Sequence, residues 1–170
     1  MTRVVQHQLS IQASLSKVWE MWTNSLEVIK WFAPVAHIEP VVGGKYELFF
    51  MPSNLPNKNT SGCYIVQMIP ERELTFTWKG PSQFTELMNT PTPQTLVTVR
   101  FKQNPNGSTC VKLFHRGFQE DSSWDYAYDW HELVWAGVLN QLQTHAEKSI
   151  DFLLGYTPNV ETKLTVSCAG

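Results

Sequence analysis

The sequence predicts an α+β protein in which an antiparallel sheet curls around one long helix. Residues 4–13 alternate apolar and polar side chains, which is the period-two pattern of a half-buried strand. Five more short apolar segments follow between residues 35 and 115, separated by Gly, Pro and Asn clusters. From about Ser122 the apolar spacing becomes that of a helix and persists for nearly thirty residues. Consecutive short strands pair antiparallel because parallel pairs need long crossovers, so the terminal helix is free to cover one face of the sheet.

The first strand is followed by two short helices. Ser14 ends the alternation, and the apolar residues at positions 15, 18, 19 and 22 then form one helical stripe. A serine directly before such a stripe caps the amino end of a helix. A second helix is predicted from about Ser25 to residue 31 or 32, because Pro34 disfavours helical geometry at the residue before it.

Turn residues divide the middle of the chain into strands. Asn106-Gly107, within residues 103–109, is the clearest hairpin signal. Residues 52–60 and 88–95 are longer, polar, Pro-containing loops. The five predicted strand segments are VAHIEPVVGGKYELFFM, SGCYIVQMIP, ELTFTWKG, TLVTVRFKQ and STCVKLFH, with Gly43-Gly44 turning into the second half of the first.

The long helix is predicted to run from Ser122 to Phe152 as one rod. Ser122 with Asp125 resembles a capping box at its start. A helix of this length spans about 40 Å, which is enough to cross six or seven strands spaced about 4.8 Å apart. Gly155 and Pro158 end it, which predicts a single domain over residues 1–154 and a carboxy-terminal tail over 155–170. Within that tail, residues 161–168 are either a loose segment or an added edge strand.

Composition favours a cytoplasmic protein with a large apolar interior. The chain has 170 residues, a formal charge of -2, and 13 Lys and Arg against 15 Asp and Glu. These charges are spread along the sequence, so we expect no basic patch and no binding to nucleic acid or to a membrane surface. Neither a signal peptide nor an apolar run of 18 residues is present. Cys63, Cys110 and Cys168 are odd in number and form no CxxC pair, which predicts three free thiols.

Short motifs found in order along residues 4–148 carry a resemblance to a known family. They are Val18-Trp19, Trp31-Phe32, Gly43-Gly44, Gly62 through Pro70 and Arg72 to Leu74–Trp78, Thr109 with Leu113, His115, Gly117 and Phe118, and His131-Glu132 through Trp135 to Leu139 and Leu142. The chain resembles the helix-grip fold of the START and Bet v 1-like (SRPBCC) superfamily, and within it the Aha-type activators of a heat-shock chaperone ATPase. The resemblance implies a curled antiparallel sheet of six or seven strands around the long helix, with two short helices after the first strand.

Alternation along the strands assigns one face of the sheet to the long helix. The inward set is Tyr46, Leu48, Phe50, Tyr64, Val66, Met68, Leu74, Phe76, Trp78, Val97, Val99, Phe101, Val111, Leu113 and His115. These bulky side chains either fill a solid core or line a cavity, and the pattern alone leaves both open. An enclosed empty void of about 300 Å³ would cost on the order of 7 kcal/mol, so a cavity is expected only with a ligand, pinned walls or partial collapse.

The resemblance implies that such a cavity holds a small hydrophobic ligand. The predicted ligand-binding residues are Trp31, Phe32, Phe50, Tyr64, Phe76, Trp78, Val99, Phe101, Leu113, His115, His131, Trp135 and Leu139. The leading hypothesis is a non-catalytic binding domain for a hydrophobic or aromatic molecule, with no cofactor. The superfamily also contains chaperone regulators and enzymes, so a protein-interaction module that regulates a chaperone ATPase and a cyclase-type or hydrolase-type enzyme remain alternatives.

Catalytic and metal motifs are weak in this sequence. His115 and His131 are predicted near one end of the cavity, where two imidazoles would suit acid-base chemistry near neutral pH. The segment HELVW at 131–135 begins like a zinc-protease motif, but Trp135 replaces the second histidine. Asp125, Asp129 and Glu132 are interpreted as a solvated helix face rather than as metal ligands. The sequence names neither the ligand nor the oligomeric state.

Overall fold

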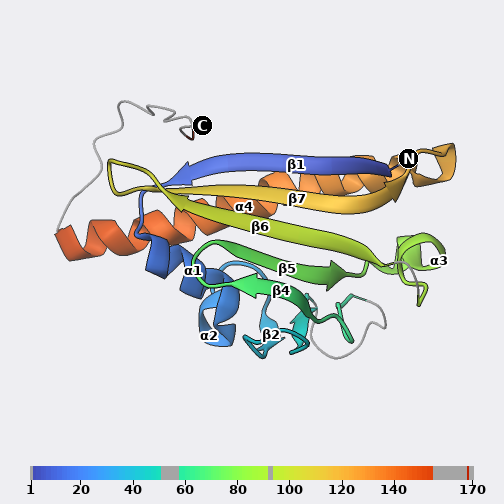
Figure 1. Ribbon diagram of the computed structural model, residues 1–170, viewed down its shortest axis with the longest axis horizontal. Coiled ribbons are helices and arrows are strands. Elements are labelled where there is room, and N and C mark those ends of the chain that lie inside the picture. The colour runs from blue at the N-terminus through green and yellow to red at the C-terminus, as the bar shows by residue number, and fades with distance from the viewer. Residues whose placement is uncertain (1, 51–57, 92–93, 155–167, 169–170) are drawn as a thin grey trace.

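The structure is a computed structural model that describes residues 2–50, 58–91, 94–154 and 168. It has the predicted α+β architecture, with an antiparallel sheet and the long helix α4 against one of its faces (Figure 1). The strands are β1 (Thr2–Ile11), β2 (Val35–Ile38), β3 (Tyr46–Phe49), β4 (Ile65–Ile69), β5 (Glu73–Trp78), β6 (Thr95–Gln103) and β7 (Thr109–Gln119). The helical elements are α1 (Leu15–Thr23), α2 (Ser25–Val28), η1 (Ser82–Phe84), α3 (Thr85–Met88), η2 (Ser122–Trp124) and α4 (Asp125–Leu154).

The described strands form two hydrogen-bonded sets. Five strands pair in the order β1-β7-β6-β5-β4, and β2 pairs with β3. Isolated bridges from Lys45 to Tyr64 and from Phe49 to Asn59 connect the two sets. The sheet of six or seven strands expected from the sequence therefore corresponds to these two sets joined through the region between β3 and β4.

The long helix follows the strands lengthwise instead of crossing them. Figure 1 shows α4 lying lengthwise along β1 and β7, with its axis roughly aligned with these two antiparallel strands. Contacts with β1 progress in step along both elements: Asp125 lies 2.7 Å from Arg3, and the Gln143 amide donates to the Ser10 carbonyl at 3.0 Å. The helix and the first strand are both tens of ångströms long, so this alignment lets α4 cover a complete strand. Within the part of α4 whose side chains are described, residues 125–148, the buried residues are Ala127, His131, Trp135, Leu139, Leu142 and Ala146.

Local signals at the helix ends are confirmed in part. The Ser14 hydroxyl accepts a hydrogen bond from the backbone N–H of Lys17 at 3.3 Å, as a capping residue should. At the start of the long helical segment the cap is Asp121, whose carboxylate accepts from the N–H of Ser123 at 3.0 Å. The predicted Ser122–Asp125 capping box is wrong, because Ser122 is the first residue of η2 and the capping residue is Asp121, one position earlier. Helix α2 ends at Val28, and hydrogen-bonded turns continue to residue 32.

The predicted inward face of β4 is wrong at two positions. Tyr64 and Val66 are exposed, whereas Ile65 is fully buried and pairs with Phe76. The register between β4 and β5 shifts between Ile65 and Gln67, which is the signature of a bulge. Because one extra residue reverses the alternation, Met68 packs against the core although Val66, two residues earlier, does not.

A glycine bends β7 beside the first strand. Gly117 has a φ of +107°, and a Cβ placed there would lie 3.1 Å from the Thr95 Cα. The pairing of β1 with β7 shifts register between Arg3 and Val4, at the same level of the sheet. The irregularity allows His115 and Phe118, three positions apart, both to be fully buried on the inner side.

The expectation of three free thiols is wrong for two of them. Cys110 at the start of β7 forms a disulfide with Cys168, with the Cα atoms 5.5 Å apart, while Cys63 is free and buried. Spacing along the chain did not reveal this pair because 58 residues separate its members. Apart from Cys168, residues 155–170 lie outside the described part of the chain, so the domain boundary at 154 stays a prediction. The cytoplasmic location also stays a prediction. The Cys110–Cys168 disulfide is unusual for that location, because disulfides are uncommon in reducing compartments.

Candidate functional site

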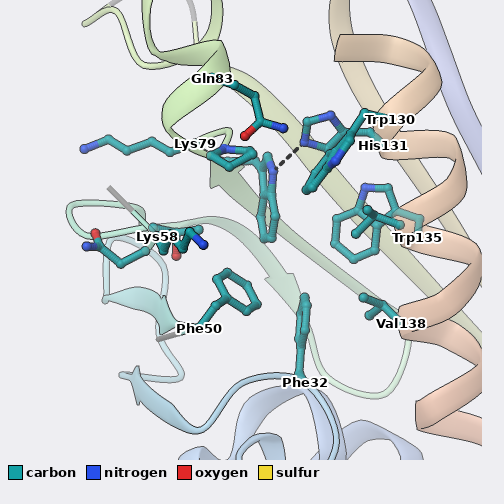
Figure 2. Close-up of a pocket in the computed structure, with 14 residues that line it drawn as sticks. Phe32, Phe50, Lys58, Lys79, Gln83, Trp130, His131, Trp135 and Val138 are labelled. Carbon is teal, nitrogen blue, oxygen red and sulfur yellow. Dashed lines mark hydrogen bonds between the residues drawn. The ribbon is translucent and has the colours of Figure 1, made fainter. Parts of the chain in front are cut away.

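A cavity of about 360 Å³ opens between the end of β5, the first half of α4 and the segment after β3 (Figure 2). Five aromatic side chains dominate its walls: Phe32, Phe50, Trp78, Trp130 and Trp135. The remaining lining residues are Lys58, Asn59, Thr60, Lys79, Pro81, Gln83, His131, Val134 and Val138. If it were enclosed and dry, a space of this size would cost on the order of 9 kcal/mol. The cavity opens to solvent, so water can occupy it in the absence of a ligand.

The aromatic walls are packed against one another. Trp78 is nearly parallel to Phe32, with ring centroids 6.2 Å apart and planes inclined by 11°. Trp78 and Trp135 have centroids 5.1 Å apart, and Phe32 meets Trp135 edge-on at 5.8 Å. Trp78 and Trp135 are both buried, so contacts on their far sides hold them in place. This packing allows the cavity to keep its shape while it is empty.

His131 orders one wall of the cavity. Its Nε2 accepts a hydrogen bond from the indole N–H of Trp78 at 3.2 Å, and its Nδ1 lies 2.7 Å from the Ala127 carbonyl. Since a carbonyl only accepts, Nδ1 carries the proton and the ring is the neutral Nδ1–H tautomer. Burial away from water lowers the pKa of His131 to about 4. The ring therefore serves as a neutral support for Trp78 at physiological pH.

His115 belongs to a directed chain of hydrogen bonds behind the cavity. The indole N–H of Trp135 donates to its Nδ1 at 3.0 Å, so its Nε2–H donates to the Thr95 hydroxyl at 2.9 Å. That hydroxyl donates in turn to the Trp78 carbonyl at 3.2 Å. Burial and the neighbouring His131, in that order, lower the pKa of His115 well below its usual value. Both ring nitrogens are engaged, and the ring centroids of the two histidines are 5.0 Å apart.

The structure brings together some of the predicted binding residues and buries the rest in the core. Phe32, Phe50, Trp78, His131 and Trp135 line the cavity. The predicted residues outside its lining are Trp31, Tyr64, Phe76, Val99, Phe101, Leu113, His115 and Leu139. With the exception of the exposed Tyr64, these are buried within the core.

Large side chains fill the space between sheet and helix away from the cavity. Phe76 stacks on Tyr46 with centroids 4.0 Å apart, and Phe101 meets Trp19 edge-on at 5.3 Å. The Tyr46 hydroxyl donates to the Trp22 carbonyl at 2.9 Å, which satisfies its buried polar atom. Core and cavity, left as alternatives by the sequence, are therefore both present at different ends of the same interface.

Several lining residues were not predicted. Trp130, Val134 and Val138 follow one another at four-residue intervals on α4, beside the stripe that packs on the sheet. The signal available in the sequence was an apolar band on the helix that is wider than its contact with the sheet requires. Lys58, Gln83 and the other residues from loops follow no periodic pattern, so only the fold places them at the cavity.

The fold agrees with a comparison against family models. A model for "Activator of Hsp90 ATPase homolog 1-like protein" matches residues 12–147. The chain belongs to this family. As an AHSA1-like domain it has a fold that suits ligand binding or regulation, and the family assignment does not choose between them. Curated proteins gave no significant match to the sequence.

Solved structures share the AHSA1-like fold at low sequence identity. A protein from Mesorhizobium loti is 21% identical, with a TM-score of 0.66 over 87% of this chain and 98% of its own. The Aha1 dimer from Colwellia psychrerythraea is 20% identical, with a TM-score of 0.66 over 85% of this chain and 96% of its own. An AHSA1-like protein from Rhizobium etli is 19% identical, with a TM-score of 0.63 over 95% of this chain and 93% of its own. These similarities establish the fold alone.

The AHSA1-like sheet carries basic side chains on the face opposite α4. Arg100 on β6 pairs directly across from Lys112 on β7. The guanidinium carbons of Arg100 and Arg116 lie 5.5 and 4.7 Å from the centroid of the Phe114 ring. Arg72 borders the same surface. Strand pairing thus gathers basic residues that are scattered along the chain, together with Glu73, which is ion-paired with Arg100 at 2.7 Å. The expectation of no binding to nucleic acid or membrane stays a prediction.

Other polar features of the AHSA1-like chain have structural partners. Asp125 pairs with Arg3 at 2.7 Å, and Glu132 lies 3.0 Å from His7, so these helix carboxylates contact β1 as well as solvent. Within the described residues, no group of three or more His, Cys, Asp and Glu is arranged to hold a metal ion. Across the same residues, no helix is both long enough and apolar enough to pass through a lipid bilayer.

Proposed function

We propose that this AHSA1-like protein binds a small hydrophobic, aromatic molecule in the cavity beside α4, without transforming it. The observation that carries the proposal is the cavity of about 360 Å³ with five aromatic side chains in its walls. Such a volume falls in the range of small-molecule sites, which are mostly apolar and pre-formed. Burial of apolar surface by a ligand there contributes roughly 25 cal/mol of favourable free energy per Å².

Binding is favoured over catalysis because the two histidines have no free nitrogen. His131 is held by Trp78 and Ala127, and His115 by Trp135 and Thr95. A general acid or base needs a nitrogen within reach of the substrate and a pKa near the working pH. Their lowered pKa values and occupied nitrogens support a structural role, so we do not propose the cyclase or hydrolase alternatives.

A thermal-shift screen with neutral aromatic compounds tests the proposal. Ligands should raise the melting temperature of the protein, because they bind the folded state only. Val138→Trp should abolish the shift by filling the cavity, since Val138 lines it. Leu133→Trp is the matched control on the same helix, because Leu133 is 78% exposed. A screen without shifts, or shifts that survive Val138→Trp, would contradict cavity binding.

A second candidate function is protein interaction that regulates an Hsp90-type chaperone, and the basic face of the sheet supports it. Arg100 lies directly across from Lys112 on β7 and is ion-paired with Glu73, whose carboxylate lies 2.7 Å from its Nε. An acidic surface on a partner would complement the positive charge of Lys112 and Arg116 and would pack against Phe114 between the two arginines. The family description names Hsp90 ATPase activation, which makes such a chaperone the first partner to test.

Affinity measurements with a purified Hsp90-type chaperone test this second candidate. Arg100→Glu combined with Arg116→Glu should weaken binding by at least tenfold at low salt, and added salt should weaken wild-type binding. Lys45→Glu is the control, because Lys45 is exposed directly before β3, a strand that pairs with neither β6 nor β7. Absence of binding at micromolar concentrations, or binding that the double variant leaves unchanged, would count against the interaction.

A further inference from the structure

We propose that the cavity selects aromatic ligands that carry a negative charge, such as aryl carboxylates, and that Lys58 recognises the charged group. This inference rests on the proposed function, because it concerns the same cavity. It adds a ligand class that follows from the polar atoms at the opening.

Most polar atoms of the lining are occupied by the protein itself. Both nitrogens of His131 and the indole N–H of Trp78 are hydrogen-bonded internally. The Thr60 hydroxyl accepts from the Leu48 N–H at 2.9 Å, and the Lys79 ammonium donates to the Ser61 carbonyl at 2.6 Å. These interactions keep the walls in place, and among these groups the Lys79 ammonium, with three N–H donors, keeps donors beyond the one bonded to Ser61.

The polar groups left without a partner are mainly donors. Among the described residues, the Lys58 ammonium, the Gln83 amide and the Trp130 indole N–H make no hydrogen bond or ion pair. Figure 2 places Lys58 across the cavity from Trp135, with Gln83 also at the border of the space. An ammonium and an indole N–H only donate, and an amide donates through its nitrogen. Such a set matches an acceptor on the ligand.

Charge adds a second reason for an anionic group. Lys58 and Lys79 line the cavity, whereas none of its lining residues is Asp or Glu. The surplus of positive charge at an apolar opening favours an anion and disfavours a cation. Hydrogen bonds to a charged acceptor are also roughly twice as strong as neutral ones. A flat ring system would pack between Phe32, Phe50 and Trp135. Its carboxylate, directed to the opening, would accept hydrogen bonds from the Lys58 ammonium.

Matched naphthalene probes test the selectivity on the full-length protein. Calorimetry or tryptophan-fluorescence titration would compare 2-naphthoate, neutral 2-naphthamide and cationic 2-naphthylmethylammonium, which share one ring system. We expect naphthoate to bind about tenfold more tightly than naphthamide, and the cation to bind most weakly. Lys58→Gln should reduce the preference for naphthoate to within about twofold and leave naphthamide binding unchanged. Lys112→Gln, on the opposite face of the sheet, should change neither.

The outcomes separate this inference from the proposed function. Equal binding of naphthoate and naphthamide overturns the selectivity and leaves cavity binding supported. A preference for naphthoate that Lys58→Gln does not reduce overturns the assignment to Lys58, and with it the inference. Failure of all three probes and of neutral apolar compounds to bind overturns the proposed function itself.

Discussion

Acid should destabilise this protein through its buried histidines, and His131 gives the clearest case. Its pKa is about 4 in the folded chain, against a usual value near 6.5 when it is exposed in the unfolded chain. As the pH falls, the unfolded chain therefore takes up a proton before the folded chain does. The contribution is fully present above about pH 6.5, is lost progressively as the pH falls towards about 4, and changes no further below that.

The size of the effect follows from the two pKa values. Between pH 7.5 and pH 5, proton uptake by the unfolded chain at His131 lowers the free energy of unfolding by about 2 kcal/mol, and the full shift corresponds to about 3 kcal/mol. His115 adds a loss of the same sign, because burial lowers its pKa as well. The structural source is the same for both rings, since charging either one would oppose the hydrogen bonds from Trp78 and Trp135.

Urea unfolding at pH 7.5, 6 and 5 measures this loss. The variant His131→Gln should be less stable than the wild type at pH 7.5, but its free energy of unfolding should fall about 2 kcal/mol less on going to pH 5. Because both proteins contain the same carboxylates, the difference in pH dependence between them isolates His131. Parallel pH dependence of His131→Gln and wild type would refute the reasoning.

Four further substitutions have expected effects on unfolding in urea. Gly117→Ala should lower the free energy of unfolding by about 1–3 kcal/mol, because Gly117 has a positive φ and lies close to the Thr95 backbone. Gly137→Ala has open space at its Cβ and should raise the free energy of unfolding by up to about 1 kcal/mol. A Gly137→Ala variant less stable than Gly117→Ala would contradict both expectations. Cys168→Ser should lose about 2–4 kcal/mol by opening the bond to Cys110, and a reductant should reproduce that loss in the wild type but not in the variant. Thr95→Val should cost about 1–3 kcal/mol by breaking the hydrogen-bond chain behind the cavity, so an unchanged midpoint would argue against that chain.

Local patterns predicted the elements because each depends on neighbours in the sequence. The apolar stripe from Ser122 predicted α4, and Ser14 predicted the start of α1, since helix periodicity and capping involve residues within one or two turns. The sequence predicted less securely which side chains of each strand face the core. One bulge after Ile65 turned Tyr64 to solvent, and nothing in the alternation of that segment announced it.

The sequence by itself determined the α+β class, the element order and a stock of large rings for the interior, because periodicity and composition are properties of the chain alone. Only the tertiary structure decided where those rings fill a core and where they leave a cavity at Trp78 and Trp135. It also decided that Cys110 meets Cys168 and that arginines from separate strands share one face. Each of these depends on contacts between distant segments, and such contacts are fixed by packing and strand register rather than by neighbouring residues.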